Sequence, residues 1–148
     1  MTTIYSPSKP QHPLVPGGVS TSARSLLNFV EMVVNKGVFN GKRVLSEAAV
    51  TAMLSDQTAG AAIQYTPYVG GNPYTTPAVN PVRYGIGNWL DVKAANGTLL
   101  ESCSPGAFGT HPWQDSAHGV AGVIFTVAEL RISQPISLQI RELVRKQL

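Results

Sequence analysis

The segment from residue 104 to residue 110 has the residue types of a turn that faces a substrate. It reads Ser-Pro-Gly-Ala-Phe-Gly-Thr and leads into a polar turn and then an apolar strand. Gly106 and Gly109 can adopt positive φ angles or let another group approach the backbone closely. Ser104 adds a hydroxyl group, which can donate one hydrogen bond but carries no charge. These features make this edge of a predicted sheet the first candidate for a binding site.

Nucleophilic residue types lie on both sides of this turn. Cys103 precedes it and His111 follows it, so one hypothesis is a small enzyme that uses Ser104 or Cys103 together with His111. Nothing near Cys103 in the sequence favours its thiolate form, and free cysteines are among the residues most often buried. We therefore expect Cys103 to lie in the core.

Two histidines and an aspartate near the same turn raise the question of a metal site. His111 and Asp115 lie four residues apart in a predicted strand and so share one face, while His118 follows across a turn. This spacing matches no standard metal site and supplies no fourth ligand. We expect no metal, and the sequence indicates no cofactor.

Four stretches of the chain resemble, in the same order, motifs of one enzyme superfamily. They read PGGVSTSARSLLNF at residues 16–29, GVFNGKRVLS at 37–46, YGIGNW at 84–89 and SPGAFGT at 104–110. The chain is therefore similar to the serine β-lactamase, penicillin-binding protein and esterase superfamily, the class C β-lactamase-like serine hydrolases. The resemblance implies a partial β-lactamase/transpeptidase-like fold and a relation to hydrolases of ester or amide bonds.

The resemblance also implies roles for residues 104–107. The family has Lys-Thr-Gly, His-x-Gly or Trp-x-Gly at the position that reads Ser104-Pro105-Gly106 here, and these groups bind the substrate carboxylate or help to position the oxyanion. The amide just past the glycine, here that of Ala107, helps to form the oxyanion hole. We expect Ser104, Pro105, Gly106 and Ala107 to contact substrate, with Ser104 and Ala107 as the candidates for a catalytic role. Because Ser104 supplies no charge and Pro105 no N–H group, β-lactam binding is disfavoured more than ester binding.

The nucleophile motifs of the family are not found. The family uses Ser-x-x-Lys at the start of a buried helix and a Tyr-x-Asn or Ser-x-Asn partner, both upstream of the matching stretches. Ser6 and Lys9 have the first spacing, but Pro10 biases Lys9 towards an extended conformation, so we interpret the match as a coincidence. No Tyr-x-Asn occurs. We expect a truncated C-terminal part of such a hydrolase, inactive alone, or an active hydrolase if another chain supplies the missing N-terminal half.

An alternative function is a self-associating binding or assembly module. In the family, two N-terminal strands complete the sheet beside the strand that corresponds to residues 120–127. Without them that strand has an unpaired edge, which is a template for strand pairing. We expect a homodimer formed through this edge or through the helix of residues 135–148, unless the N-terminal arm pairs with the edge instead.

Composition restricts the remaining possibilities. The 148 residues fit one domain, the net charge is +3, and the positive charges are scattered, so we expect no nucleic-acid partner. A single cysteine excludes an internal disulfide, and no apolar run is long enough for a signal peptide or a membrane span. The family has periplasmic, secreted and cytoplasmic members, so the resemblance does not fix a cellular location.

Residue patterns predict an α+β fold in which helices cover an antiparallel sheet. Residues 1–18 form an extended Pro- and Ser-rich arm, residues 19–148 form the domain, and residues 56–83 form a long irregular loop. Helices are predicted from Ser22 to about Lys36, ended by Gly37 as the C′ residue, and from residue 46 to residue 54. The first helix should turn one apolar face towards the core, made of Leu26, Phe29, Val30 and Val33.

The second half of the chain predicts strands followed by a helix. The strands are expected at residues 84–92, 97–104, 108–115 and 120–127, with Trp89 and Trp113 packed in the core or on a sheet face. Pro135 should open the final helix, because proline is tolerated in the first turn. The core face of that helix should consist of Ile136, Ile140, Leu143 and Val144.

Overall fold

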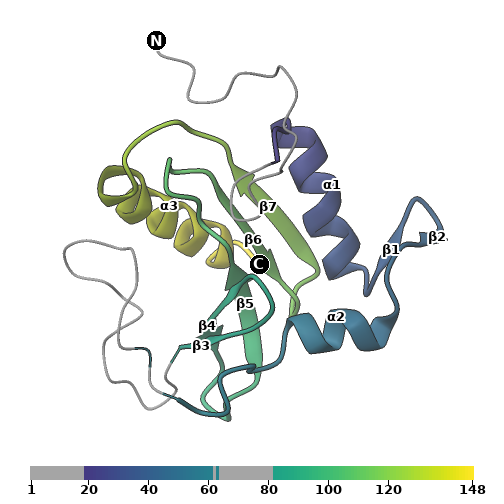
Figure 1. Ribbon diagram of the computed structural model, residues 1–148. Coiled ribbons are helices and arrows are strands. Elements are labelled where there is room, and N and C mark those ends of the chain that lie inside the picture. The colour runs from purple at the N-terminus through teal and green to yellow at the C-terminus, as the bar shows by residue number, and fades with distance from the viewer. Residues whose placement is uncertain (1–18, 62, 64–81) are drawn as a thin grey trace, which may run out of the picture.

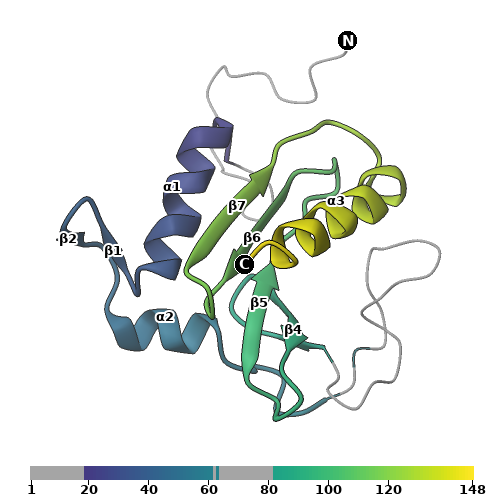
Figure 2. The same ribbon diagram turned by 180° about the vertical axis from the view of Figure 1, so that it is seen from behind.

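A computed structural model of the chain describes residues 19–61, 63 and 82–148, and in these ranges helices cover both faces of an antiparallel sheet (Figures 1 and 2). The predicted arm and residues 62 and 64–81 of the predicted loop lie outside the described residues. The main sheet has five strands in sequential order, and each strand pairs antiparallel with the next. They are β3 (Arg83–Tyr84), β4 (Trp89–Lys93), β5 (Leu99–Cys103), β6 (His111–Asp115) and β7 (Val120–Ile124). The expected α+β class is confirmed.

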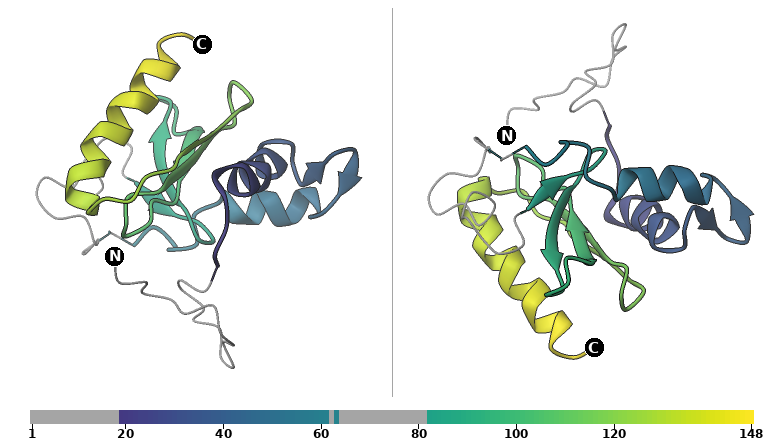
Figure 3. Two further views of the ribbon diagram at one scale, coloured as in Figure 1. Left: turned by 90° about the horizontal axis from the view of Figure 1, so that it is seen from above. Right: turned by 90° about the horizontal axis from the view of Figure 1, so that it is seen from below.

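Helices lie on opposite sides of this sheet. Figure 3 shows α3 (Leu130–Arg145) on one side and α1 (Ala23–Val34) with α2 (Glu47–Met53) on the other. The short hairpin of β1 (Val38–Phe39) and β2 (Lys42–Arg43) links α1 to α2. Buried residues form two apolar clusters, one of Cys103, Trp113 and Leu130 beneath α3, and one of Met32, Val33 and Val50 between α1 and α2. The predicted burial of Cys103 is confirmed, and Trp89 packs against the same cluster as Trp113.

Helix α1 begins as predicted, but its C-terminal end lies one residue earlier than predicted. Ser22 is the N-cap, and its side chain accepts a hydrogen bond of 3.1 Å from the N–H of Ser25. At the other end, Gly37 donates to the carbonyl of Met32 and Lys36 to that of Val33, which is the Schellman pattern. Lys36 therefore takes the left-handed C′ position, with φ at +52°, and Gly37 is C″ rather than C′.

The strand predicted at residues 84–92 is broken into β3 and β4. Gly85 donates to the carbonyl of Asn88 and closes a tight turn, while Ile86 donates to the carbonyl of Met53 at the end of α2. A Cβ atom on Gly85 would lie 2.1 Å from that Met53 oxygen, so only glycine allows α2 to approach this closely. The strand predicted from residue 108 likewise begins only at His111, because Gly106 and Gly109 donate hydrogen bonds within a preceding turn.

The final helix buries a different face from the one predicted, and the two faces share only Val144. It begins at Leu130, so Pro135 lies inside it rather than at its start. Val144 is half-buried as part of the core, but Ile136, Ile140 and Leu143 are exposed. The buried face is instead mostly polar and consists of Leu130, Ser133, Gln134, Ser137 and Arg141.

A buried ion cluster explains this orientation of α3. The guanidinium of Arg141 donates to both carboxylate oxygens of Asp91 on β4, at 2.7 and 3.1 Å, and to Glu101 on β5 at 2.7 and 3.1 Å. The side chain of Arg141 is 1% exposed. Burial alone would lower the pKa of Arg141, but Asp91 and Glu101 outweigh it and raise this pKa above its ordinary value. The Arg141 guanidinium therefore holds α3 to the sheet through its ion pairs with Asp91 and Glu101.

We predict that Arg141→Met destabilises the chain by about 3–5 kcal/mol, because it removes the buried cation that Asp91 and Glu101 share and leaves Glu101 with Arg145 as its cation. Chemical denaturation monitored by circular dichroism would measure the change. The triple variant Arg141→Met/Asp91→Asn/Glu101→Gln should recover most of the loss, and the exposed Arg24→Met should have almost no effect. Equal stability of Arg141→Met and the parent chain would contradict the role of the cluster.

Candidate functional site

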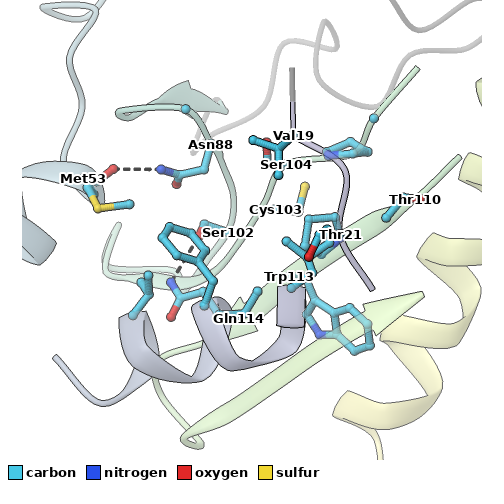
Figure 4. A pocket seen from close by; sticks show the side chains of 18 of the residues that line it. Val19, Thr21, Met53, Asn88, Ser102, Cys103, Ser104, Thr110, Trp113 and Gln114 are labelled. Carbon is cyan, nitrogen blue, oxygen red and sulfur yellow. Dashed lines mark hydrogen bonds between the residues drawn. The ribbon is translucent and has the colours of Figure 1, made fainter. Parts of the chain in front are cut away.

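A cavity of about 850 Å³ lies between α1, the start of β6 and the turn that joins β3 to β4 (Figure 4). Its lining includes residues of α1, whereas the Arg141 cluster belongs to α3, and Figure 3 shows these two helices on opposite sides of the sheet. No charged side chain is among the described residues that line it. The lining combines a polar part from the sheet with an apolar part from α1 and Phe125.

All of the predicted substrate-contacting residues, Ser104, Pro105, Gly106 and Ala107, border this cavity. The N–H of Ser104 donates to the carbonyl of Pro112 at 3.1 Å, and that of Gly106 donates to Thr110 at 2.8 Å, so both groups are engaged. Within the described ranges no group accepts a hydrogen bond from the N–H of Ala107. Of the three amides, that of Ala107 is the one available to a bound group, and its role in substrate binding stays a prediction.

The turn that carries these residues is anchored to the start of α3. Phe108 accepts a hydrogen bond of 2.9 Å from the N–H of Ala128, and the Thr110 hydroxyl donates to the carbonyl of Thr126 at 3.2 Å. Gly109 has φ at +93°, and a Cβ atom there would lie 2.8 Å from the Ser133 hydroxyl oxygen. Gly109 is therefore the glycine that this turn requires, whereas a Cβ atom on Gly106 would meet nothing closer than 3.7 Å.

Three polar side chains of the cavity were not predicted from the sequence (Figure 4). Gln114 on β6 donates to the Ser102 hydroxyl on β5 at 3.1 Å. Asn88 donates from Nδ2 to the carbonyls of Met53 and Ile86, at 2.9 and 3.0 Å, which fixes the orientation of its amide. Its Oδ1 is buried and has no partner in the described part of the chain. Alternation along β5 could have indicated Ser102, because it lies on the opposite face from Glu101 and Cys103.

The apolar wall of the cavity is the face of α1 that was predicted to pack in the core. Leu26, Phe29, Val30 and Val33 all line it, and Phe29 is half exposed. Val30 and Val33 are buried as expected, but Phe29 on the same face borders the cavity and is not packed in the core. This space separates α1 from β5 and leaves room for an apolar group.

Of the residues in the alternative hypotheses, Ser104 and Cys103 border the cavity, whereas His111, Asp115 and His118 are not part of its lining. The Cys103 thiol donates to Asp91 at 3.2 Å, and His111 is buried with its Nε2 at 3.3 Å from the Arg141 guanidinium. Asp115 binds His118 instead, with 2.8 Å between Oδ2 and Nδ1. Among the described residues no group of three or more side chains could hold a metal ion. His111 thus belongs to the α3 contact.

Burial and the nearby Arg141 guanidinium lower the pKa of His111 to about 4, against a smaller opposite effect of Asp91. Its Nδ1 has no hydrogen-bond partner in the described part of the chain. In the unfolded chain His111 has its ordinary pKa of about 6.5, and in the folded chain its pKa is about 4. Between these two values the unfolded state binds more protons, so a fall in pH through this range lowers the free energy of unfolding.

We predict that the chain loses about 3 kcal/mol of stability between pH 6.5 and pH 4 through His111. The variant His111→Gln, which cannot take up this proton, should lack that part of the loss. The free energy of unfolding, measured by urea denaturation across the range, would show the difference. His118→Gln should keep the decline of the parent chain, and an unchanged profile for His111→Gln would contradict the assignment.

No protein-family model matches the chain, and no curated protein does. The chain is similar to the crystal structure of a provisionally assigned beta-lactamase from Bacteroides dorei DSM 17855, with a TM-score of 0.66 and 25% sequence identity. The fold is β-lactamase-like. The similarity covers 80% of this chain but 35% of that protein, so the chain spans about a third of its β-lactamase-like neighbour. No described helix is long and apolar enough to cross a membrane.

Proposed function

We propose that the chain forms one wall of the acyl-binding site of a β-lactamase-like hydrolase, and that another chain supplies the attacking group. The observation that carries this proposal is the cavity beside residues 104–107, which are the residues that the family resemblance assigns to substrate binding. The similarity to one provisionally assigned beta-lactamase supports the same assignment. By itself the chain is inactive in this proposal.

The chemistry of the wall favours a neutral, apolar acyl group over an anionic substrate. Ser104 and Pro105 offer neither a positive charge nor an additional N–H donor, and the described lining contains no lysine or arginine. The Ala107 N–H would stabilise an oxyanion, as such donors contribute about 2.7–4 kcal/mol to a transition state when a nucleophile stands opposite. Phe29 and Phe125 would cover the acyl chain. An uncharged ester or amide is therefore the proposed substrate class.

The role of Ala107 can be tested without catalysis. Titration of ¹⁵N-labelled chain with the monoanion of ethyl benzylphosphonate, which presents an oxyanion, should move the Ala107 amide resonance more than neutral diethyl benzylphosphonate does. Ala107→Pro removes the N–H and should weaken binding of the monoanion by about ten- to a hundredfold, since a hydrogen bond to a charged group contributes about 1.5–3 kcal/mol. Ala107→Gly keeps the N–H and should bind like the parent chain. Shifts confined to residues away from the cavity would contradict the proposal.

Catalysis gives a second test. The purified chain should hydrolyse p-nitrophenyl butyrate no faster than buffer does, because positioning groups without a nucleophile do not form an acyl intermediate. Hydrolysis that disappears in Ser6→Ala would show that the upstream Ser6 and Lys9 form a working site, and would refute the proposed inactivity of the chain.

A further inference from the structure

Two hairpins of the chain carry an asparagine followed by a glycine at their tips. Asn40-Gly41 joins β1 to β2, and Asn96-Gly97 lies between β4 and β5. All four residues are exposed, and no other asparagine in the sequence precedes a glycine. An asparagine in this position can be converted without an enzyme, because glycine has no side chain to shield its backbone nitrogen from the neighbouring carboxamide.

This conversion joins the glycine nitrogen to the asparagine side chain. After losing its proton, the nitrogen attacks Cγ of the asparagine, so that the N–Cγ bond forms, the Cγ–Nδ2 bond breaks and ammonia leaves. Water then opens the cyclic succinimide at one of its two carbonyl groups. Opening at one carbonyl gives aspartate, and opening at the other gives isoaspartate, whose main chain runs through the former side chain. The reaction therefore needs an unengaged glycine N–H and a carboxamide that is free to approach it.

The Asn40-Gly41 turn leaves both reacting groups free. It connects the paired residues Phe39 and Lys42, and Figure 1 shows this hairpin at the outer end of α1 and α2, away from the main sheet. Asn40 and Gly41 have φ at +49° and +74°, as in a type I′ turn. Within the described residues neither the Gly41 N–H nor the Asn40 carboxamide makes a hydrogen bond. A Cβ atom on Gly41 would meet nothing within 4 Å, so the space beside its nitrogen is open.

The Asn96-Gly97 turn engages the same two groups. The N–H of Gly97 donates to the carbonyl of Ala94 at 2.9 Å, and Asn96 Oδ1 accepts a hydrogen bond of 3.0 Å from the N–H of Thr98. Formation of the succinimide in this turn has to break both hydrogen bonds, which raises its barrier. The fold therefore leaves one asparagine reactive and protects the other.

We propose that Asn40 is a site of spontaneous deamidation in the folded chain, and that the turn around Asn96 protects that residue. The products at position 40 are aspartate and isoaspartate. The inference does not depend on the proposed acyl-binding function, because neither asparagine lines the cavity beside residues 104–107.

Isoaspartate at position 40 changes the link between α1 and α2. It adds one carbon atom to the main chain of the turn, so the register of Phe39 with Lys42 has to shift. Phe39 packs against the apolar cluster between α1 and α2, and a shift of the hairpin therefore reaches the core.

Peptide mass mapping of the chain after incubation in mildly alkaline H₂¹⁸O tests the proposal. Each conversion replaces an amide by a carboxyl group that carries oxygen from the labelled water. Conversion at Asn40 should be at least about fivefold faster than at Asn96 in the folded chain, since two net hydrogen bonds protect Asn96. Asn40→Gln should abolish the signal at that position, because glutamine has to form a larger ring. The matched variant Asn96→Gln should keep it.

The same chain unfolded in guanidinium chloride provides the reference. Neither turn persists there, so the two asparagines should convert at nearly equal rates. The ratio of the two rates in the folded chain, divided by their ratio in the unfolded chain, measures the contribution of the fold.

Three outcomes would overturn the proposal. One is equal conversion of Asn40 and Asn96 in the folded chain. Another is a folded chain in which Asn40 stays intact although it converts in the denaturant, which would show that the type I′ turn blocks the attack. The last is a preference for Asn40 that persists unchanged in the denaturant, which would come from neighbouring residues in the sequence and not from the fold.

Discussion

The position of one buried guanidinium determines how the two faces of this domain differ. Arg141 reaches from α3 into the sheet and binds carboxylates on two neighbouring strands. A charge with such geometry is tolerated in the interior only when each of its partners is present and its remaining donors are satisfied. The sheet side of α3 is polar for this reason, and the isoleucines of the helix are left on the outside. The opposite face of the sheet, which carries the cavity, contains no such cluster among its described residues.

Local sequence signals predicted the parts of the fold that depend on neighbouring residues. The starts of α1 and α2 were predicted at Ser22 and Ser46, which are the N-caps, because a capping side chain acts within the next three residues. The break between β3 and β4 was missed, because it depends on α2, whose Met53 carbonyl approaches Gly85. The orientation of α3 was wrong for a similar reason. Hydrophobic periodicity favoured the isoleucine face, whereas the partners of Arg141 lie 40 and 50 residues away in the sequence.

The candidate site likewise has one part that depends on neighbouring residues and another that depends on residues distant in the sequence. Residues 104–107 are contiguous, so a sequence motif could place all four of them at one cavity. Asn88, Ser102 and Gln114 come from three separate segments and meet only through the register of β5 with β6 and the turn before β4. A sequence without coordinates contains no information on that register beyond the alternation of side chains. The neutral character of the cavity is also a property of the assembled site, since charged residues occur along much of the chain but not in its described lining.

Gly109 joins the two sides of the molecule. Its left-handed backbone lies against Ser133 in the first turns of α3, and the adjoining Phe108 and Thr110 are hydrogen-bonded to the strand exit that leads into the helix. These contacts therefore couple the turn that borders the cavity to helix α3 on the other face of the sheet. A substitution that shifts α3 will therefore also move the turn at the cavity, so the cavity and the packing of α3 must be redesigned together.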